Sequence, residues 1–310
     1  MQFGLGVGLC PNILILEICL IKGISPNFYV FDLIFFCSRF RHPDQRYILW
    51  EIESPAYLMS FKPENYKNYF NWTMTYRQDS TISIPYGWIE KIKNHPSGEQ
   101  LEKMINNFGE KHKHLADKGG GKVKIAWMVS NCLSESNREG FVEALKKHMD
   151  VDIFGSCYKN SKKCDKSNFE TCWNKISQEY HFYLAFENSL CKDYVTEKFW
   201  EPLKRNIVPV VLGGSNYSKI APYRSYVDVN DMGLDEDPAS LAKILTDLVK
   251  NKSKYASYFW WKEYYNVRNS PQDRASDHCK VCQLLHEIDK KVRNSILFFI
   301  KEINIDVCFS

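Results

Sequence analysis

Two acids, an amide, a phenol and a lysine crowd one short segment of the chain, residues 186–198. They stand where an apolar run ends and a helical pattern begins: Glu187, Asn188, Tyr194, Glu197 and Lys198. The free N–H groups and the positive dipole end of a helix N-terminus suit a diphosphate. Lys198 can add a full positive charge, and Glu197 can accept hydrogen bonds from ribose hydroxyls. From the residues alone, capping of the helix by Asp193 or Thr196 explains the same pattern equally well.

The elements around this segment follow the order of an α/β unit. Apolar runs alternate with amphipathic helical patterns, which predicts parallel strands joined by crossover helices. Ligands of open parallel sheets bind off the carboxyl ends of the strands. Ser130, Asn131 and Arg138 follow the first of these strands and should therefore lie beside the segment at 186–198. The predicted strands are residues 123–129, 151–154, 180–186 and 207–212, and the predicted helices are residues 138–148, 195–205 and 238–250.

A second α/β zone precedes this one. It contains two runs that read as buried strands, residues 29–36 and 47–52, and a polar segment ending in Gly119-Gly120-Gly121 separates the zones. Two such zones joined by a linker predict an α/β chain with two Rossmann-like domains that face a cleft. The predicted domains are residues 27–118 and 122–262, followed by a helical segment at 263–292 and a tail at 293–310.

Residues 1–26 are mostly apolar but fit neither a membrane span nor a signal peptide. Glu17 interrupts the apolar run, and no basic residue precedes Lys22. A spanning helix needs about 20 apolar residues, and a signal peptide begins with positive charge. We therefore expect either a poor signal-anchor or a sequence that is not part of the folded domain.

The composition favours a lumenal enzyme over a nucleic-acid-binding protein. The net charge of +4 is mild, and the lysine clusters are short, as in a solvated linker. Eleven cysteines and three sequons, at Asn71, Asn216 and Asn251, favour an oxidising compartment. Cys279 and Cys282, with histidines nearby, can also ligate zinc, although no second such pair stands at zinc-ribbon spacing.

Several blocks of the sequence are specific enough to indicate a family. They are residues 183–189 with Phe186-Glu187-Asn188-Ser189, residues 192–200, residues 208–213, residues 45–55, residues 70–77, Ser130-Asn131 with Arg138, and the terminal Cys-x-x-Cys. These blocks resemble the α-1,3-fucosyltransferases of glycosyltransferase family 10, more the invertebrate type than the bacterial. The resemblance covers about residues 29–286. It implies a GT-B fold with an N-terminal acceptor domain and a C-terminal GDP-fucose domain.

The resemblance also implies roles for the donor-side residues. Arg138 and Lys198 would neutralise the diphosphate of GDP-fucose, and a planar guanidinium suits phosphate oxygens taken two at a time. A surface salt bridge is the alternative role for Arg138. Glu197 would bind the ribose, with Asn188 and Tyr194 nearby in the nucleotide pocket. Further donor-side candidates are Ser130, Asn131 and Glu187.

The catalytic base, by the same resemblance, is Glu53, which directly precedes Ser54-Pro55. Inversion of a β-linked donor requires a carboxylate opposite GDP that takes the proton of the acceptor hydroxyl. The transition state should resemble an oxocarbenium ion. Asp79 is a rival base, whereas Glu51 shares the strand but does not match the motif. A carboxylate that only shapes a turn is the alternative for Glu53.

No metal or other cofactor is expected to be required, although divalent cations can stimulate the reaction. The acidic run Asp235-Glu236-Asp237 precedes a predicted helix and is better explained as its cap. Arg138 and Lys198 supply the positive charge that stabilises the leaving group. The resemblance implies that Cys279 and Cys282 form a disulfide near the domain junction, with a redox centre or a zinc site as the alternative.

The predicted function is transfer of L-fucose from GDP-fucose to the GlcNAc of glycoprotein or glycolipid glycans, in the Golgi lumen. The family is held at the Golgi membrane by a single-pass anchor, which is not evident in this chain, and no nucleic-acid partner is expected. Because Glu53 comes so early in the chain, the N-terminal domain is predicted to be truncated. A catalytically inactive relative that still binds a GDP-sugar is the alternative hypothesis, and a transferase that uses UDP-sugars is the third.

Overall fold

The computed structural model describes residues 16–20, 46–57, 68–159, 161–164, 169–235, 237–269, 280–281 and 284, with side chains from Tyr47 onward. The chain divides into two compact units. Unit 1 comprises residues 1–85 and 271–307, and unit 2 comprises residues 86–270 and 308–310. Within the described residues, no helix is both long and apolar enough to span a membrane.

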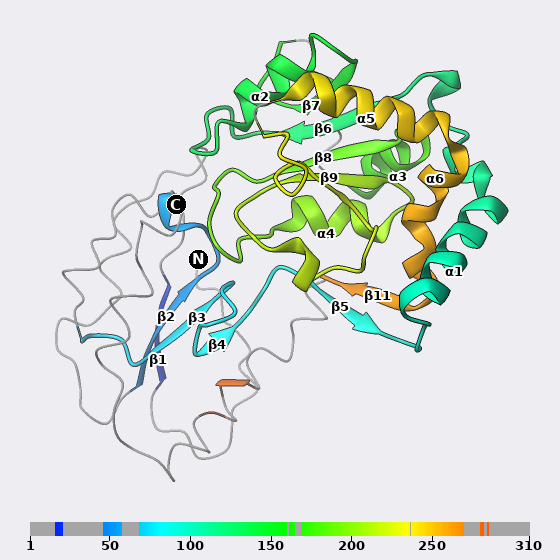
Figure 1. The fold of residues 1–310 in the computed structure, drawn as a ribbon. Helices are drawn as coiled ribbons and strands as arrows, with labels where there is room; N and C mark the ends of the chain where they lie inside the picture. Colours follow the sequence, from blue (N-terminus) through cyan, green and yellow to red (C-terminus); the bar gives the residue numbers. More distant parts are fainter. Residues whose placement is uncertain are drawn as a thin grey trace. The chain divides into compact units, whose positions relative to one another are not determined.

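Unit 2 is built on a parallel sheet of five strands in the order β10-β9-β8-β6-β7. Figure 1 labels the four strands β9, β8, β6 and β7 of this sheet. Two of the three interior strands, β8 and β9, are buried along their whole length, as expected of a sheet that is covered on both faces. The strands are β6 (Ile125–Val129), β7 (Val151–Gly155), β8 (Phe182–Phe186), β9 (Val208–Leu212) and β10 (Val227–Asp228).

Helices cover the two faces of this sheet and create two hydrophobic cores. Along β8, Phe182 and Leu184 enter one core with α2 and α5, whereas Tyr183 enters the other with α3 and α4. This alternation is the period of two that a strand imposes on its side chains. The helices are α2 (Arg138–Leu145), α3 (Phe169–Glu179), α4 (Glu197–Lys204) and α5 (Pro238–Lys250).

Shorter elements complete unit 2. An antiparallel pair, β5 and β11, carries the register Trp88↔Arg268. Asn251 caps α6 through its side chain, which accepts a hydrogen bond from the amide of Lys254 at 3.0 Å. The elements are β5 (Trp88–Lys91), α1 (Gly98–Lys111), η4 (Lys113–Ala116), η5 (Gly119–Gly121), η6 (Tyr217–Lys219), α6 (Lys252–Ala256), η7 (Ser257–Glu263) and β11 (Tyr265–Arg268).

Unit 1 contains a parallel sheet in the order β1-β2-β3-β4. Its described core is formed by Ile48, Trp72, Met74 and Ile82, with Ile84 and Val281 beside them. The strands are β1 (Leu16–Leu20), β2 (Arg46–Glu51), β3 (Trp72–Thr75) and β4 (Ile82–Ser83), and the turn η2 (Pro55–Tyr57) follows β2. The α/β class and the presence of two parallel-sheet units are as predicted from the sequence. A cleft between the units stays a prediction.

Part of the segment 1–26, for which the sequence predicts either a poor signal-anchor or a sequence outside the folded domain, is a strand of unit 1. Residues 16–20 form β1, which pairs in parallel with β2 in the register Leu16↔Arg46 to Leu20↔Trp50. A short apolar run is equally consistent with a buried strand, and periodicity alone does not distinguish the two. The predicted strand at 29–36 lies outside the described residues.

The division of the chain also differs from the predicted boundary at the three glycines. It falls between Pro85 and Tyr86, so that α1 belongs to unit 2. Because a Cβ at Gly109 would overlap the carbonyl oxygen of Ser253, only glycine lets α1 approach α6 so closely. The three glycines instead form η5, a turn inside unit 2, with φ of 62° at Gly120. A run of glycines indicates backbone dihedral angles that other residues rarely adopt. It does not by itself indicate a domain boundary.

Candidate active site

The loop after β6 is held against the end of β8 by one serine. The hydroxyl of Ser136 donates to the carbonyl oxygen of Glu187 at 2.7 Å, and its amide donates to that of Asn188 at 3.2 Å. Asn137 then takes a left-handed φ of 50°, and α2 begins at the next residue. The predicted loop and the predicted 186–198 segment are therefore neighbours, as the parallel topology required.

Arg138 is not a surface residue, because only 2% of it is exposed. Its Nη1 donates to the carbonyl oxygen of Phe186 at 2.8 Å, its Nη2 to that of Asn131 at 3.3 Å, and its Nε to the Glu139 carboxylate at 3.1 Å. A guanidinium carries five N–H donors. Two of them therefore have no partner among the described residues. Arg138 links the two strand ends and keeps donors for a further acceptor.

Glu187 is the most deeply buried acid of the predicted set, with no exposed surface. Its Oε1 accepts from the amide of Thr196 at 2.7 Å, and its Oε2 accepts from the Thr196 hydroxyl at 2.8 Å. Thr196 is the N-cap of α4, so this carboxylate sits at the positive end of that helix. Burial raises the pKa of Glu187, and Lys198 opposes that rise.

Lys198 points its ammonium group into the same cluster. The Nζ donates to the Thr196 hydroxyl at 2.9 Å and to Glu197 at 3.1 Å, and it lies 3.5 Å from Oε2 of Glu187. Burial alone would lower the pKa of Lys198, but the carboxylates of Glu187 and Glu197 outweigh burial and raise it. Lys198 is thus a permanent cation at neutral pH, and 18% of its side chain is exposed.

Asn188 and Tyr194, two further residues of the predicted donor site, are both buried and both carry a polar group. The side-chain oxygen of Asn188 has no partner among the described residues, although the residue is only 9% exposed. Tyr194 is 1% exposed, and its ring meets that of Tyr86 edge to face at 6.2 Å. A buried acceptor without a donor is costly, so it suits a ligand that brings a donor.

Sequence reasoning missed a second polar group at the end of β9. The Tyr217 hydroxyl is buried and unpaired within the described chain, and it is so close to Gly213 that a Cβ there would overlap it. Asn230 donates to the carbonyl oxygen of Gly213 at 2.8 Å. Burial raises the pKa of Asp228 to about 6. The family block ends at Gly213 and the sequon begins at Asn216, but neither indicates Tyr217, because an isolated tyrosine carries no spacing signal.

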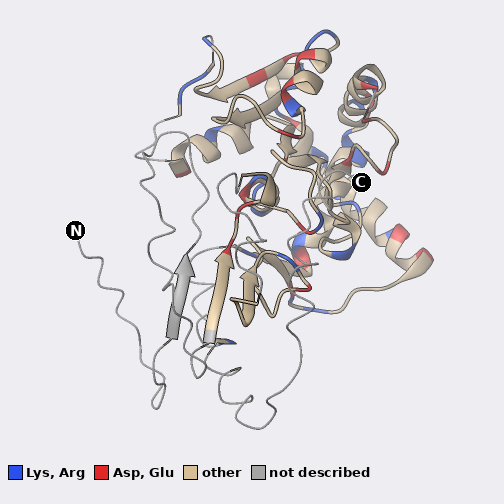
Figure 2. Ribbon diagram, turned by 90° about the vertical axis from the view of Figure 1, so that its left-hand side faces the viewer, with Lys and Arg blue, Asp and Glu red and all other residues tan. Residues whose placement is uncertain are grey.

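In unit 1, two acidic residues, Glu51 and Glu53, stand at the end of β2, where acidic positions are drawn red in Figure 2. Glu53 is half-buried, and its amide donates to Oε1 of Glu51 at 2.7 Å. The rival Asp79 receives both Nε and Nη2 of Arg77, at 2.7 and 2.5 Å. Both oxygens of Asp79 are thus engaged by one guanidinium, and the choice between Glu53 and Asp79 as the base stays a prediction.

The described cysteines of unit 2 are all disulfide-bonded. Cys132 is bonded to Cys157 with 5.1 Å between their Cα atoms, and Cys164 to Cys172 with 5.5 Å. Cys191 is also disulfide-bonded. The predicted pair Cys279 and Cys282 lies outside the described residues. No group of three potential metal ligands occurs within the described ranges.

The three sequon asparagines differ in their surroundings. Asn216 is exposed, and its side chain accepts from the hydroxyl of Ser218 at 2.6 Å. Asn251 is exposed as well, but its side chain is the cap of α6. Asn71 is half-buried and accepts from the amide of Tyr47 at 2.9 Å. Asn216 and Asn251 are thus exposed and Asn71 is not, and glycosylation at each of the three stays a prediction.

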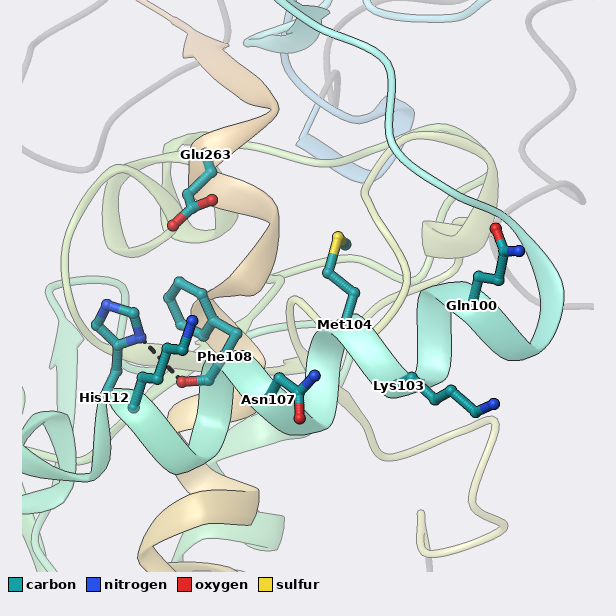
Figure 3. Close-up of a pocket in the computed structure, with 8 residues that line it drawn as sticks. Gln100, Lys103, Met104, Asn107, Phe108, His112 and Glu263 are labelled. Carbon is teal, nitrogen blue, oxygen red and sulfur yellow. Dashed lines mark hydrogen bonds between the residues drawn. The ribbon is translucent and has the colours of Figure 1, made fainter.

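Two hollows in unit 2 lie apart from the predicted site residues. The smaller, of about 430 Å³, runs along α1, where the rings of Phe108 and His112 stack with centroids 4.0 Å apart and Glu263 faces them (Figure 3). The larger, of about 770 Å³, is lined by the 116–124 segment and by His181, which precedes β8. It therefore lies at the amino-terminal edge of the sheet, opposite the edge at which parallel sheets bind ligands.

Two family models match the chain. The model described as glycosyltransferase family 10 (fucosyltransferase) C-term matches residues 120–299, which is more than half of the chain. The chain belongs to glycosyltransferase family 10. The model described as fucosyltransferase, N-terminal matches residues 27–87.

Curated members of family 10 are similar over most of this chain. An alpha-(1,3)-fucosyltransferase C of Drosophila melanogaster is 36% identical over 80% of the chain and 56% of its own length. A 4-galactosyl-N-acetylglucosaminide 3-alpha-L-fucosyltransferase of Pongo pygmaeus is 36% identical over 83% of the chain and 64% of its own length. The chain thus spans less than two thirds of each of these relatives. A solved alpha1,3-fucosyltransferase with GDP-fucose has a TM-score of 0.46 at 19% identity, covering 70% of this chain and 67% of that one.

Proposed function

We propose that this family 10 chain transfers L-fucose from GDP-fucose to the GlcNAc of glycoprotein or glycolipid glycans, forming an α-1,3 linkage with inversion. The observation that carries the proposal is the cluster of Glu187, Thr196 and Lys198 at the start of α4. It keeps a cation at the N-terminus of a helix that follows a parallel strand. That arrangement favours an anionic leaving group such as a nucleoside diphosphate.

In this proposal, the donor is bound by unit 2. Lys198 and the two remaining N–H donors of Arg138 neutralise the diphosphate, and Glu197 accepts from the ribose hydroxyls. Asn188 offers an unpaired buried oxygen to the nucleotide, with Tyr194 beside it. Ser130 and Asn131 stand on the adjoining loop. Glu187 serves the site through Thr196 and Lys198, because both of its oxygens are already engaged.

The reaction needs one proton transfer and one displacement at the anomeric carbon. The bond between C1 of fucose and the diphosphate oxygen breaks, and GDP takes that electron pair. The hydroxyl oxygen of the acceptor forms the new bond to C1 from the opposite face, and the Glu53 carboxylate accepts its proton. Because positive charge develops on the sugar, a nearby carboxylate also stabilises the transition state.

The compartment follows from the same proposal. Disulfides persist in oxidising compartments, and the bonded cysteines of unit 2 fit a lumenal enzyme. We propose that the protein acts in the Golgi lumen, held at the membrane by the anchor typical of its family, and that it requires no metal.

An assay with separate binding and turnover readouts tests the proposal. Purified protein is incubated with GDP-fucose and N-glycans that offer antennal or core GlcNAc, and the product linkage is determined by NMR. Calorimetry measures GDP binding, with UDP as the competitor control. An α-1,3-linked product with preference for GDP supports the proposal. GDP binding without transfer would indicate an inactive sugar-nucleotide-binding relative, and equal binding of UDP would indicate a different donor.

A further inference from the structure

The last residue of β2 is a buried acid that the fucosyl-transfer mechanism does not use. Only 4% of Glu51 is exposed. The residue pairs with Thr75 of β3 in the final step of the parallel ladder. The hydroxyl of Thr75 is close to the hydroxyl of Ser80 and accepts from the amide of Arg77 at 3.2 Å, so it is engaged away from Glu51. A carboxyl group at such a place needs a reason, since acids are seldom buried without partners.

The reason lies in the two amides that follow. The ladder between β2 and β3 ends at Glu51, so the next N–H groups lie beyond the described pairing of these two strands. Both donate instead to Oε1 of Glu51, from Ile52 at 2.8 Å and from Glu53 at 2.7 Å. An unsatisfied buried N–H costs about 1–3 kcal/mol. The side chain of Glu51 therefore closes the end of the strand and sets the backbone of the next two residues.

The other side of the turn is fixed as well. Ser54 is fully buried, and its carbonyl oxygen accepts from the amide of Tyr57 at 3.0 Å, which begins η2. Glu53 thus stands between two anchors, the Glu51 carboxyl group before it and the buried Ser54 after it. The first anchor acts through a side chain, so substitution can test it.

We propose that Glu51 is the positioning residue of Glu53, holding the turn that presents the catalytic carboxylate through its two hydrogen bonds to the backbone. This inference rests on the proposed fucosyl transfer with Glu53 as base. A base must lie within hydrogen-bond reach of its proton, and a displacement of about 1 Å can reduce turnover about 100-fold. Glu51 is predicted to act on kcat through geometry without touching a substrate.

The second oxygen of Glu51 supports this assignment. Oε2 is buried and has no hydrogen-bond partner among the described residues. Burial raises the pKa of Glu51 to about 7, against the two amides, which lower it, and the Glu53 carboxylate contributes to the rise. A carboxyl group that served only solubility or an ion pair would not be buried with one oxygen lacking a partner. Oε1 accepts both hydrogen bonds, so the side-chain amide oxygen of a glutamine can take its place.

Three variants and one control test the proposal. Glu51→Gln keeps an acceptor at the position of Oε1, Glu51→Asp shortens the side chain by one methylene, and Glu51→Leu removes the acceptor. The control is Glu90→Gln, because Glu90 is an exposed glutamate of β5 that pairs with Arg268. For each variant we measure kcat, the KM for GDP-fucose, the unfolding transition, and amide hydrogen exchange of residues 52–57.

We expect Glu51→Asp and Glu51→Leu to lower kcat about 10- to 100-fold with the KM for GDP-fucose unchanged. Glu51→Gln should keep kcat within about threefold of the parent, because an amide oxygen still accepts from both N–H groups. The exchange of residues 52–57 should accelerate in the Asp and Leu variants only. If the Leu variant does not fold, the Asp variant still tests the proposal, because it keeps a carboxyl group at this position.

Two results would overturn the proposal: folded Asp or Leu variants with parental kcat and exchange, or a folded Gln variant impaired as strongly as Leu. If the parent protein transfers no fucose, the proposed function fails, and the exchange measurement alone still decides whether Glu51 holds the turn. If the parent is active and the exchange and kcat of the variants are unaltered, only the role of Glu51 fails.

Discussion

Glu51 and Glu187 occupy equivalent places in the two units and meet opposite surroundings. Each stands at the carboxyl end of a parallel strand, β2 in unit 1 and β8 in unit 2, and each is at least 96% buried. Both oxygens of Glu187 are satisfied, by Thr196 and by the ammonium group of Lys198. Glu51 bonds through one oxygen to two backbone amides, and its other oxygen has no partner within the described residues.

The difference shows that residue type and topological position do not determine what a buried carboxyl group does. Burial raises the pKa of both acids. At Glu187 a neighbouring cation compensates the charge, and the resulting ion pair organises a charged site. At Glu51 no cation among the described residues compensates it, so the group tends to keep its proton and acts on the backbone. One strand end is organised for binding an anion, and the other for placing a base.

The largest expected effect tests whether unit 2 binds the donor while unit 1 supplies the base. Glu53→Gln removes the base from unit 1 and should lower kcat about 10²- to 10⁴-fold. The affinity for GDP should not change, because the donor-side residues belong to unit 2. Steady-state kinetics and calorimetry on the same preparation provide both values. A variant that keeps parental kcat would exclude Glu53 as the base.

The next prediction concerns the ion pair of unit 2. Lys198→Met keeps the apolar stem but leaves Glu187 without its cation, which should destabilise unit 2 by about 3–5 kcal/mol. GDP affinity should fall as well. Adding Glu187→Gln should restore much of the stability but not the affinity, because the phosphate still lacks the ammonium group. Urea unfolding and calorimetry separate the two effects.

Lys192→Met is the matched control for this prediction, since Lys192 is an exposed lysine of the same segment. If Lys198→Met bound GDP as tightly as this control, Lys198 would not be a phosphate ligand.

A third prediction concerns the covalent link between the loops that follow β6 and β7. Cys132 and Cys157 close a loop with a sequence separation of 25. Replacing both by serine should lower the free energy of unfolding by about 3 kcal/mol. A reductant should shift the unfolding transition of this variant only to the extent that it breaks the disulfides that remain. An unchanged transition in the double variant would show that hydrogen bonds such as those of Ser136 suffice to hold the loop.

The smallest expected effect is the pH dependence that Glu51 imposes on stability. Its folded-state pKa of about 7 lies above the ordinary value of 4.5. The folded state therefore holds the proton more tightly, so the stability linked to it is fully present below about pH 4.5 and is lost as pH rises to 7. Between pH 5 and pH 8 the parent should lose about 2 kcal/mol relative to Glu51→Gln.

Unfolding titrations of the parent and the variant at several pH values measure this difference. The shared contribution of Asp228, whose pKa burial raises to about 6, cancels between them. Parallel pH profiles for the two proteins would show that Glu51 has no raised pKa.

The amino-acid sequence by itself determined the order of strands and helices in unit 2 and the segment that carries the charged cluster. Those features are local. Strand and helix periodicities are written in neighbouring residues, and β6, β8, β9 and α4 form close to where the patterns predicted them. The family blocks were also readable, because they are runs of adjacent residues.

Only the tertiary structure decided which polar groups are buried and with whom. Arg138 reaches a carbonyl oxygen 48 residues away, and Glu187 meets a threonine nine residues on. The division at Pro85 and the strand at 16–20 likewise depend on what packs beside them. The sequence did not single out Glu51, because its importance arises from burial and from the end of a ladder formed with β3. Burial is a property of the assembled fold, and it converts an ordinary glutamate into an anchor.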